Sequence, residues 1–484
     1  MRDAHASMGN SCKRLWRVLF IGGCCLLLEG QGCRPHPAAP LRLSTTVTLA
    51  PDDRVLILAP HPDDEVLGCG GIIQQAVAMG LPVRVVFLTY GDNNEWSFLL
   101  YRKHPVLRPS SVQRMGQVRH DEALAAAKIL GLSADQLIFL GYPDFGTMSM
   151  WKDHWGDRPP FHSMLTRVRA VPYANALRPG AAYKGEEVVR DLTTVLADFR
   201  PTKVFVSHPA DHMPDHSALY LFTRVALWDL EAELQSALYP YLVHFKRWPA
   251  SRGDLRATPL EPPRVLQTQV AWAQHVLTPE EVARKRAAIV AHRTQYGSSA
   301  RYLTSFIRPN ELFGDFPMIA LRSSQALQPI SPDRTVPAEE PSEELTDQER
   351  AAFVGVEERS AALDGETLVL SIAFSRPLAA AVEASVYVFG YRTDRPFADM
   401  PKLHIKLGAL THAIADQDRP LPQDSCGISR HLRRITLRVP LRLLGDPQRI
   451  LTSARTYLGE VPLDMVSWRV LEMETSDVHH GDRR

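Results

Sequence analysis

The stretch RVLILAPHPDDEVLGCGG, Arg54–Gly71, places a continuously apolar run directly before a histidine, two aspartates, a glutamate and a glycine-rich segment. Such a short apolar run is typical of a strand buried on both faces. In open α/β sheets, ligands bind beyond the carboxyl ends of the strands, which is where this acidic cluster would lie. The acids could instead only start a helix, because carboxylates interact favourably with the dipole at a helix N-terminus.

Outward from this stretch, apolar strands alternate with segments of helical periodicity. The strand-like runs are VRVVFLT (83–89), LIFL (137–140) and KVFVSH (203–208), and helical patterns such as VRHDEALAAAKILG lie between them. This alternation predicts a Rossmann-like α/β domain with three layers, in which helices cover both faces of a mostly parallel sheet. The segment 145–184 is rich in Trp, His, Pro and Arg, and we expect it to be an insertion at the rim.

The composition changes after this domain. Residues 324–350 contain four prolines and an excess of glutamate without apolar periodicity, which is typical of a linker. Residues 351–476 hold five strand-like runs without long helical patterns between them, and predict a small all-β sandwich. Its aromatic side chains, Tyr387, Phe389 and Trp468, are expected in the sandwich core rather than on a sugar-binding surface.

The length and net charge of the chain limit the number of domains and the kinds of partner. A chain of 484 residues that is 45% hydrophobic can form two or three domains with real cores. The net charge is +1 and no basic block is present, so the sequence favours no nucleic-acid partner. We expect a targeting segment at 1–33, a linker at 34–53, the α/β domain at 54–323, a linker at 324–350, the sandwich at 351–476 and a polar tail at 477–484.

The first residues are typical of a secretory signal. Lys13, Arg14 and Arg17 precede an apolar run at 18–28 that is too short to span a bilayer. We therefore expect export to a bacterial periplasm or cell envelope. Cys33 follows EGQG and resembles a lipoprotein cleavage site, so attachment to a membrane through a lipidated Cys33 stays open beside ordinary signal cleavage and an uncleaved anchor.

A second polar constellation follows a later strand. The segment SHPADHMPDH, 207–216, again places histidines and aspartates just after an apolar run. Both constellations can therefore converge on one edge of one sheet. Converging imidazoles and carboxylates that leave room for water are what a catalytic divalent metal requires.

At this point the sequence resembles the LmbE/PIG-L family of zinc-dependent N-acetylglucosaminyl deacetylases. The motifs HPDDE (61–65) and HPADHMPDH (208–216) are similar to the two family motifs, and the resemblance covers residues 54–313. It implies that His61, Asp64 and His216 are ligands of Zn²⁺. It further implies that Asp63 is the general base.

Weaker similarities agree with this resemblance. The segments RHDEALAAAKILG, FLGYPD and KRAAIVAHRTQ all look like family signatures. The resemblance implies that Arg119 and Asp144 belong to the substrate pocket. Either residue could instead have a structural role on a helix face or in a turn.

One position departs from the family pattern. Met213 stands where the family has an inner histidine, and methionine can donate no proton. His212, or the more distant His244, could supply an imidazole in its place, although both could be structural. Asp215 would then orient a neighbouring group.

The resemblance therefore implies a zinc-dependent deacetylase that hydrolyses the N-acetyl amide of an N-acetylglucosamine-type sugar or glycan, and the signal-like first residues imply that it is exported. Asp63 and the metal would activate water for attack on the acetyl carbonyl. Two alternatives stay open. One is a noncatalytic metal-containing carbohydrate-binding protein, which the methionine of the second motif favours, and the other is a related metal hydrolase that acts on another amide or ester.

Overall fold

The computed structural model describes residues 43, 45–93, 108–323, 326–331 and 345–474. Residues 43–484 form one compact unit. The expected targeting segment with Cys33, the polar tail and much of the 324–350 linker lie outside the described residues. Within the residues that are described, no helix combines the length and apolar character needed to cross a membrane.

The first sheet is mostly parallel, as the sequence predicts. Its strand order is β3-β2-β1-β4-β5-β7-β6, in which the first five strands are parallel and β7 and β6 are antiparallel to their neighbours. Its strands are β1 Val55–Ala59, β2 Val83–Thr89, β3 Leu137–Tyr142, β4 Lys203–Ser207, β5 Ala237–Tyr241, β6 Ala273–Val276 and β7 Asn310–Phe313.

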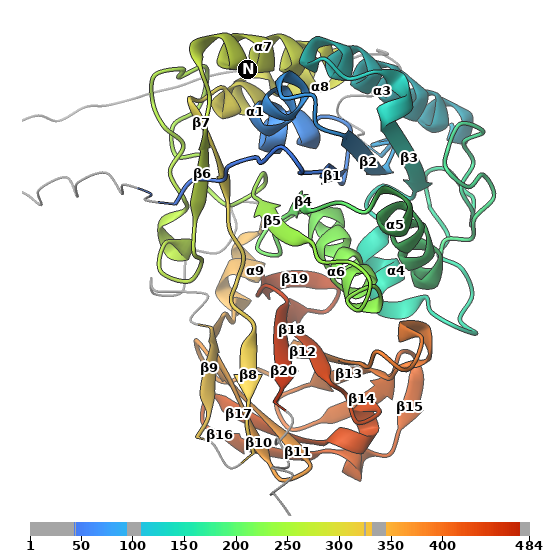
Figure 1. Ribbon diagram of the computed structural model, residues 1–484. Coiled ribbons are helices and arrows are strands. Elements are labelled where there is room, and N and C mark those ends of the chain that lie inside the picture. The colour runs from blue at the N-terminus through green and yellow to red at the C-terminus, as the bar shows by residue number, and fades with distance from the viewer. Residues whose placement is uncertain (1–42, 44, 94–107, 324–325, 332–344, 475–484) are drawn as a thin grey trace, which may run out of the picture. The chain divides into compact units, whose positions relative to one another are not determined.

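Two groups of helices complete the three layers (Figure 1). One group contains α1 Asp64–Ala78, α3 Pro109–Leu130, α7 Pro279–Ala291 and α8 Arg293–Leu303, and the other contains α4 Thr147–Asp153, α5 Gly185–Phe199 and α6 Pro214–Asp229. Helix α1 packs against α3 and α7, whereas α6 packs against α4 and α5. Because helices cover both faces of the sheet, its central strand β1 is fully apolar and every residue of β1 is buried.

The C-terminal part is an all-β sandwich, which confirms the predicted fold class. One sheet contains β9 Gln328–Ser331, β10 Val356–Asp364, β11 Thr367–Phe374, β16 Gly427–His431 and β17 Arg434–Pro440. The other contains β8 Ile319–Leu321, β12 Val382–Tyr391, β13 Lys402–Leu407, β14 His412–Asp416, β15 Arg419–Leu421, β18 Arg449–Leu458 and β20 Arg469–Met473, and β19 Val461–Met465 pairs with β18. Aliphatic side chains such as Leu370, Leu437 and Ile405 form the core of the sandwich.

Two sandwich strands begin earlier in the chain than the sequence indicates. Strand β8 lies in the segment assigned to the α/β domain, and β9 lies in the assigned linker, yet they pair with β20 and β10. A short helix, α9 Asp347–Ala352, starts within the end of that linker. The proposed domain division stays a prediction, because residues 43–484 pack as one unit.

The segment 145–184 contributes more than an insertion at the rim. Its Trp151 and Trp155 are fully buried. The ring centroid of Trp151 lies 5.2 Å from that of Phe397 and 6.0 Å from that of Trp468, and both of these residues belong to the sandwich. The α/β part and the sandwich therefore share one aromatic core. Trp468, with Tyr387 and Phe389, is buried as expected, but in this shared core and not in the core between the two sandwich sheets.

Candidate metal centre

The two polar constellations meet because their strands are neighbours. Strand β1 ends at Ala59, just before the first motif, and β4 ends at Ser207, at the start of the second. The two strands pair in parallel, so their carboxyl ends lie at the same edge of the sheet. Helices α1 and α6 then start within the motifs, at Asp64 and Pro214.

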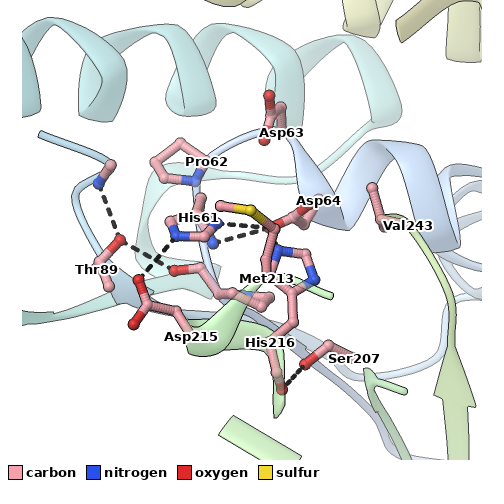
Figure 2. Close-up of polar contacts among 12 residues, drawn as sticks. His61, Pro62, Asp63, Asp64, Thr89, Ser207, Met213, Asp215, His216 and Val243 are labelled. Atoms are coloured by element: carbon pink, nitrogen blue, oxygen red, sulfur yellow. Dashed lines mark hydrogen bonds and ion pairs between the residues drawn. The ribbon is translucent and has the colours of Figure 1, made fainter. Parts of the chain in front are cut away.

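Three predicted metal ligands come together at this edge (Figure 2). Asp64 Oδ2 lies 3.2 Å from His61 Nδ1 and 3.2 Å from His216 Nε2. All three side chains are buried, and a set of one ligand atom from each lies within 4.8 Å of one another. Two imidazole nitrogens and one carboxylate oxygen are a donor set that could hold a divalent metal ion.

A carboxylate lies behind each imidazole. His61 Nε2 lies 3.0 Å from Asp144 Oδ1 and 3.3 Å from Asp215 Oδ2, while His216 Nδ1 lies 3.0 Å from Asp211 Oδ2. In metal sites, a carboxylate on the second ring nitrogen fixes the orientation of the histidine and raises its basicity. The other ring nitrogen, Nδ1 of His61 and Nε2 of His216, faces Asp64.

The charges of the group depend on one another. Burial lowers the pKa of His216, but the carboxylates of Asp211 and Asp64 outweigh it and raise this pKa to about 9. Burial raises the pKa of Asp64, yet His216 and His61 hold it well below its usual range. A metal ion would replace the protons of these imidazoles, because a ligating imidazole must be neutral.

The ring nitrogens of His216 lack hydrogen bonds, which also fits a metal site. Neither ring nitrogen of the fully buried His216 makes a hydrogen bond, although carboxylate oxygens lie 3.0 and 3.2 Å away. Buried nitrogens without a hydrogen bond are costly unless another group satisfies them. A cation between the His61, Asp64 and His216 donor atoms would satisfy His216 Nε2, while Nδ1 faces Asp211.

Asp63 has an unusual backbone conformation. Its φ is 124°, a value that side-chain-bearing residues rarely adopt and that costs about 1–3 kcal/mol. The Asp63 N–H donates to Glu65 Oε2 at 2.9 Å, and the other oxygen of Glu65 lies 3.3 Å from His292 Nε2. Figure 2 shows the side chains of Asp63 and Asp64 pointing in different directions.

The Asp63 carboxyl is also electrostatically distinct from that of Asp64. Burial raises the pKa of Asp63 to about 7; Arg119 opposes this rise and Asp64 adds to it. A carboxyl with a pKa near neutrality can both accept and release a proton, as a general base must.

The two predicted substrate-binding residues make contacts within the protein. The guanidinium of Arg119 is 4% exposed and donates to Gly91 O at 2.8 Å and Pro62 O at 2.7 Å. Its Nη2 lies 3.6 Å from Asp63 Oδ1. Asp144, in addition to its contact with His61, accepts a hydrogen bond from Asn93 N at 2.9 Å. Their roles in substrate binding stay predictions.

The remaining two predicted catalytic residues lie in different surroundings. Asp215 is fully buried and accepts hydrogen bonds from the backbone of Phe145 and from Thr147, beside His61. His212 is exposed, and its ring lies 4.8 Å from that of Phe245. The structure therefore places Asp215 with the ligand group and His212 outside it.

His244 lies closer to the ligand group than its sequence position suggests. Its ring centroid is 4.9 Å from that of His216, and its Nδ1 is 3.2 Å from Tyr302 Oη. Burial lowers the pKa of His244 to about 4, so its imidazole is neutral at pH 7. Met213 precedes α6, and Figure 2 shows its thioether directed toward the same side chains.

Sequence reasoning assigned no role to Asp211, Glu65 or His292. Asp211 stands in the second motif, so the motif itself was a signal for it. Glu65 and His292 lie in recognised segments, but their contact joins parts of the chain that no local pattern connects.

Comparisons with known proteins address the same region. Residues 56–227 match the family model described as PIG-L: GlcNAc-PI de-N-acetylase, which confirms the resemblance. Over 184 residues the chain is 30% identical to the 1D-myo-inositol 2-acetamido-2-deoxy-alpha-D-glucopyranoside deacetylase of Mycobacterium sp. strain KMS, covering 37% of this chain and 52% of the relative. The protein of that name from Salinispora arenicola strain CNS-205 is 33% identical over 211 residues, covering 43% and 60%.

A solved structure is also similar. The N,N'-diacetylchitobiose deacetylase from Pyrococcus horikoshii is 20% identical, with a TM-score of 0.32, and the match covers 52% of this chain and 76% of that one. The chain spans about half of the first curated relative and three fifths of the second.

Proposed function

Since residues 56–227 match the PIG-L family model, we propose that this protein is a zinc-dependent deacetylase of an N-acetylglucosamine-type sugar or glycan. The observation that carries the proposal is the buried group of His61, Asp64 and His216, with a carboxylate behind each imidazole. The curated relatives, which are named as deacetylases of a glucosamine-type inositol glycoside, support the same reaction class.

Zinc suits this donor set, because it prefers nitrogen and oxygen ligands and keeps an open position in catalytic sites with three protein ligands. When bound to His61, Asp64 and His216, it would supply a Lewis acid for the acetyl carbonyl and lower the pKa of a water molecule. Asp144, Asp215 and Asp211 hold the two histidine rings in place from behind.

Asp63 supplies the base for the reaction. Its carboxyl, with a pKa near 7, accepts a proton from the attacking water and can later pass it to the amine that leaves. Arg119 fixes the loop that carries Asp63 by donating to Pro62 O, and its positive charge limits how far burial raises the pKa of Asp63.

Glu65 acts as a positioning residue in this proposal. In Glu65→Gln, the shape is kept but the charge that faces the Asp63 N–H and His292 is lost. We expect kcat to fall about tenfold with KM and bound metal nearly unchanged, because Asp63 would leave its unusual conformation more often. Glu65→Asp, which keeps the charge, should recover part of kcat. An unchanged kcat in Glu65→Gln would contradict the positioning role.

Met213 favours the second candidate, a metal-containing protein that binds a sugar without hydrolysing it. Neither its thioether nor the neutral His244 beside His216 carries a proton that ionises near pH 7. Asp63 favours the deacetylase. A pocket that only binds a sugar has no need of a residue with an unusual backbone conformation and a carboxyl pKa near neutrality.

One experiment separates the candidates. The purified protein, with its metal content measured by mass spectrometry, is incubated with an N-acetylglucosamine glycoside, and released acetate and free amine are assayed. About one zinc per chain with matched acetate and amine supports the deacetylase. Zinc and sugar binding without acetate supports the binding protein, and release of another acyl group or alcohol from other substrates supports a different hydrolase.

We also propose export to the cell envelope, on the basis of Lys13, Arg14, Arg17 and the apolar run at 18–28. In a bacterial host, the mature chain should lack this segment. Palmitate labelling that disappears in Cys33→Ser would support the lipid anchor. A mature cytoplasmic chain that still carries residue 1 would contradict both ideas.

A further inference from the structure

A cleft of about 640 Å³ opens beside the candidate metal centre. Met213 and His244 line it, and the ring of His244 lies 4.9 Å from that of the predicted ligand His216. The three predicted ligands do not line the cleft themselves, but Asp211, which lies 3.0 Å from His216 Nδ1, does, so the cleft lies next to the His216 side of the metal centre. Its volume is within the range of about 300–1,000 Å³ that holds a ligand of drug size. Such a ligand is larger than a single sugar residue.

The two walls of the cleft come from different parts of the chain. Phe245 and Tyr302 belong to the α/β part, whereas Phe353, Asp464 and Met465 belong to the sandwich. All five side chains are only half-buried, so their surfaces are accessible from the cleft. The sandwich therefore forms one wall of a cleft whose other wall contains Met213 and His244, beside the predicted ligand His216.

Both walls are held firmly. On the sandwich side, Ser453 Oγ donates to Val466 O at 2.8 Å and Asp464 Oδ2 accepts from Val356 N at 2.7 Å. On the other side, Tyr302 Oη donates to Val243 O at 2.7 Å. The shared aromatic core around Trp151 holds the two parts together. A ligand would thus meet a preformed site and lose little binding energy to ordering it.

The chemistry of the walls suits a carbohydrate. A sugar ring presents apolar C–H faces and a rim of hydroxyl groups, so it can lie on an aromatic ring while polar side chains bind its edge. Phe245 and Phe353 supply such rings, whereas the Tyr302 ring already contacts Arg252 and His244. Arg252, whose guanidinium lies 4.6 Å from the centre of the Tyr302 ring, and Asp464 supply polar groups.

We propose that this cleft binds the sugar residues that extend from the N-acetylated residue of an oligosaccharide, and that the sandwich wall selects oligosaccharides over monosaccharides. The proposal rests on the proposed deacetylase function for its kinetic test. It assigns Phe353 and Met465, which the family motifs do not include, to substrate binding.

The test compares two probes, methyl N-acetylglucosaminide and triacetylchitotriose, in the full-length zinc-loaded protein. In the wild type, we expect kcat/KM for the trisaccharide to exceed that for the monosaccharide by about tenfold or more, mainly through KM. In Phe353→Ala and Met465→Ser, we expect KM for the trisaccharide to rise about tenfold with little change in kcat. The loss for the monosaccharide should be several times smaller.

Leu410→Ser and Leu432→Ser are matched controls, since these sandwich residues are 88% and 82% exposed and do not line the cleft. Both should behave as the wild type, and thermal unfolding identifies any variant that fails to fold. Equal losses on both probes, or no preference of the wild type for the trisaccharide, would overturn the proposal.

If neither probe releases acetate, the deacetylase proposal fails, and calorimetric binding of triacetylchitotriose still decides about the cleft. Binding that is weakened about tenfold in Phe353→Ala but not in Leu432→Ser supports the cleft. The absence of binding to the wild type overturns it.

Discussion

Replacement of Asp63 by asparagine is expected to lower kcat for deacetylation by about 10²-fold or more while the metal content stays that of the wild type. The amide keeps the shape of the side chain and removes its ability to take a proton from water. Asp63 itself is outside the ligand group, whose carboxylate comes from Asp64. The measurement is acetate release under substrate saturation, together with zinc per chain by mass spectrometry.

The control for this variant is Asp52→Asn, which removes a carboxylate from an exposed position a few residues earlier. It should leave kcat and zinc unchanged. If Asp63 only starts helix α1, Asp63→Asn should retain nearly all activity, since asparagine is as good as aspartate at that position. Full activity in Asp63→Asn would therefore remove Asp63 from the mechanism, and loss of zinc in that variant would make Asp63 a metal ligand.

The position of the site could be predicted because its signals are local. His61 and Asp64 follow one buried strand and His216 follows another, and parallel strands place their carboxyl ends at one edge. Sequence spacing did not show that β1 and β4 are neighbours, which follows from the strand order of the whole sheet. The carboxylates behind the imidazoles were harder to assign, because Asp144 comes from a third strand and its contact with His61 depends on tertiary packing.

The five strand-like runs expected in the sandwich do not include β18, whose buried polar residues are satisfied at long range. Strand β18 carries buried Thr452, Ser453 and Thr456, which weaken the apolar alternation that identifies a strand. Ser453 Oγ donates to Val466 O, and Thr456 Oγ1 donates to Val354 O. These partners are supplied by distant segments, so no pattern within β18 predicts them.

The same reason explains the segment 145–184. Its content of Trp, His, Pro and Arg suggested an insertion at the rim and not a part of the core. Trp151 and Trp155 are instead buried against aromatic rings of the sandwich, such as Phe397. A core formed between two parts of a chain leaves little periodic signal in either part, because only a few side chains of each contribute to it.

The second large effect concerns the metal itself. His216→Ala is expected to weaken zinc binding by more than 10²-fold and to abolish measurable deacetylation, because the variant loses one of three ligands and leaves an empty position in a buried site. The measurement is zinc affinity by competition with a chromophoric chelator. Thermal unfolding with and without zinc would show that the apo variant still folds.

A graded series makes the ligand assignment falsifiable. Asp211→Asn keeps all three ligands but weakens the carboxylate that faces His216 Nδ1 at 3.0 Å, so zinc affinity should fall by about 10–100-fold, less than in His216→Ala. His431→Ala removes an exposed imidazole from strand β16 and should bind zinc as the wild type does. The order His216→Ala, then Asp211→Asn, then His431→Ala follows from direct ligation, because only a ligand loses its own bond to the metal. Stoichiometric, tightly bound zinc in His216→Ala would place the metal elsewhere and would remove the structural basis for the deacetylase.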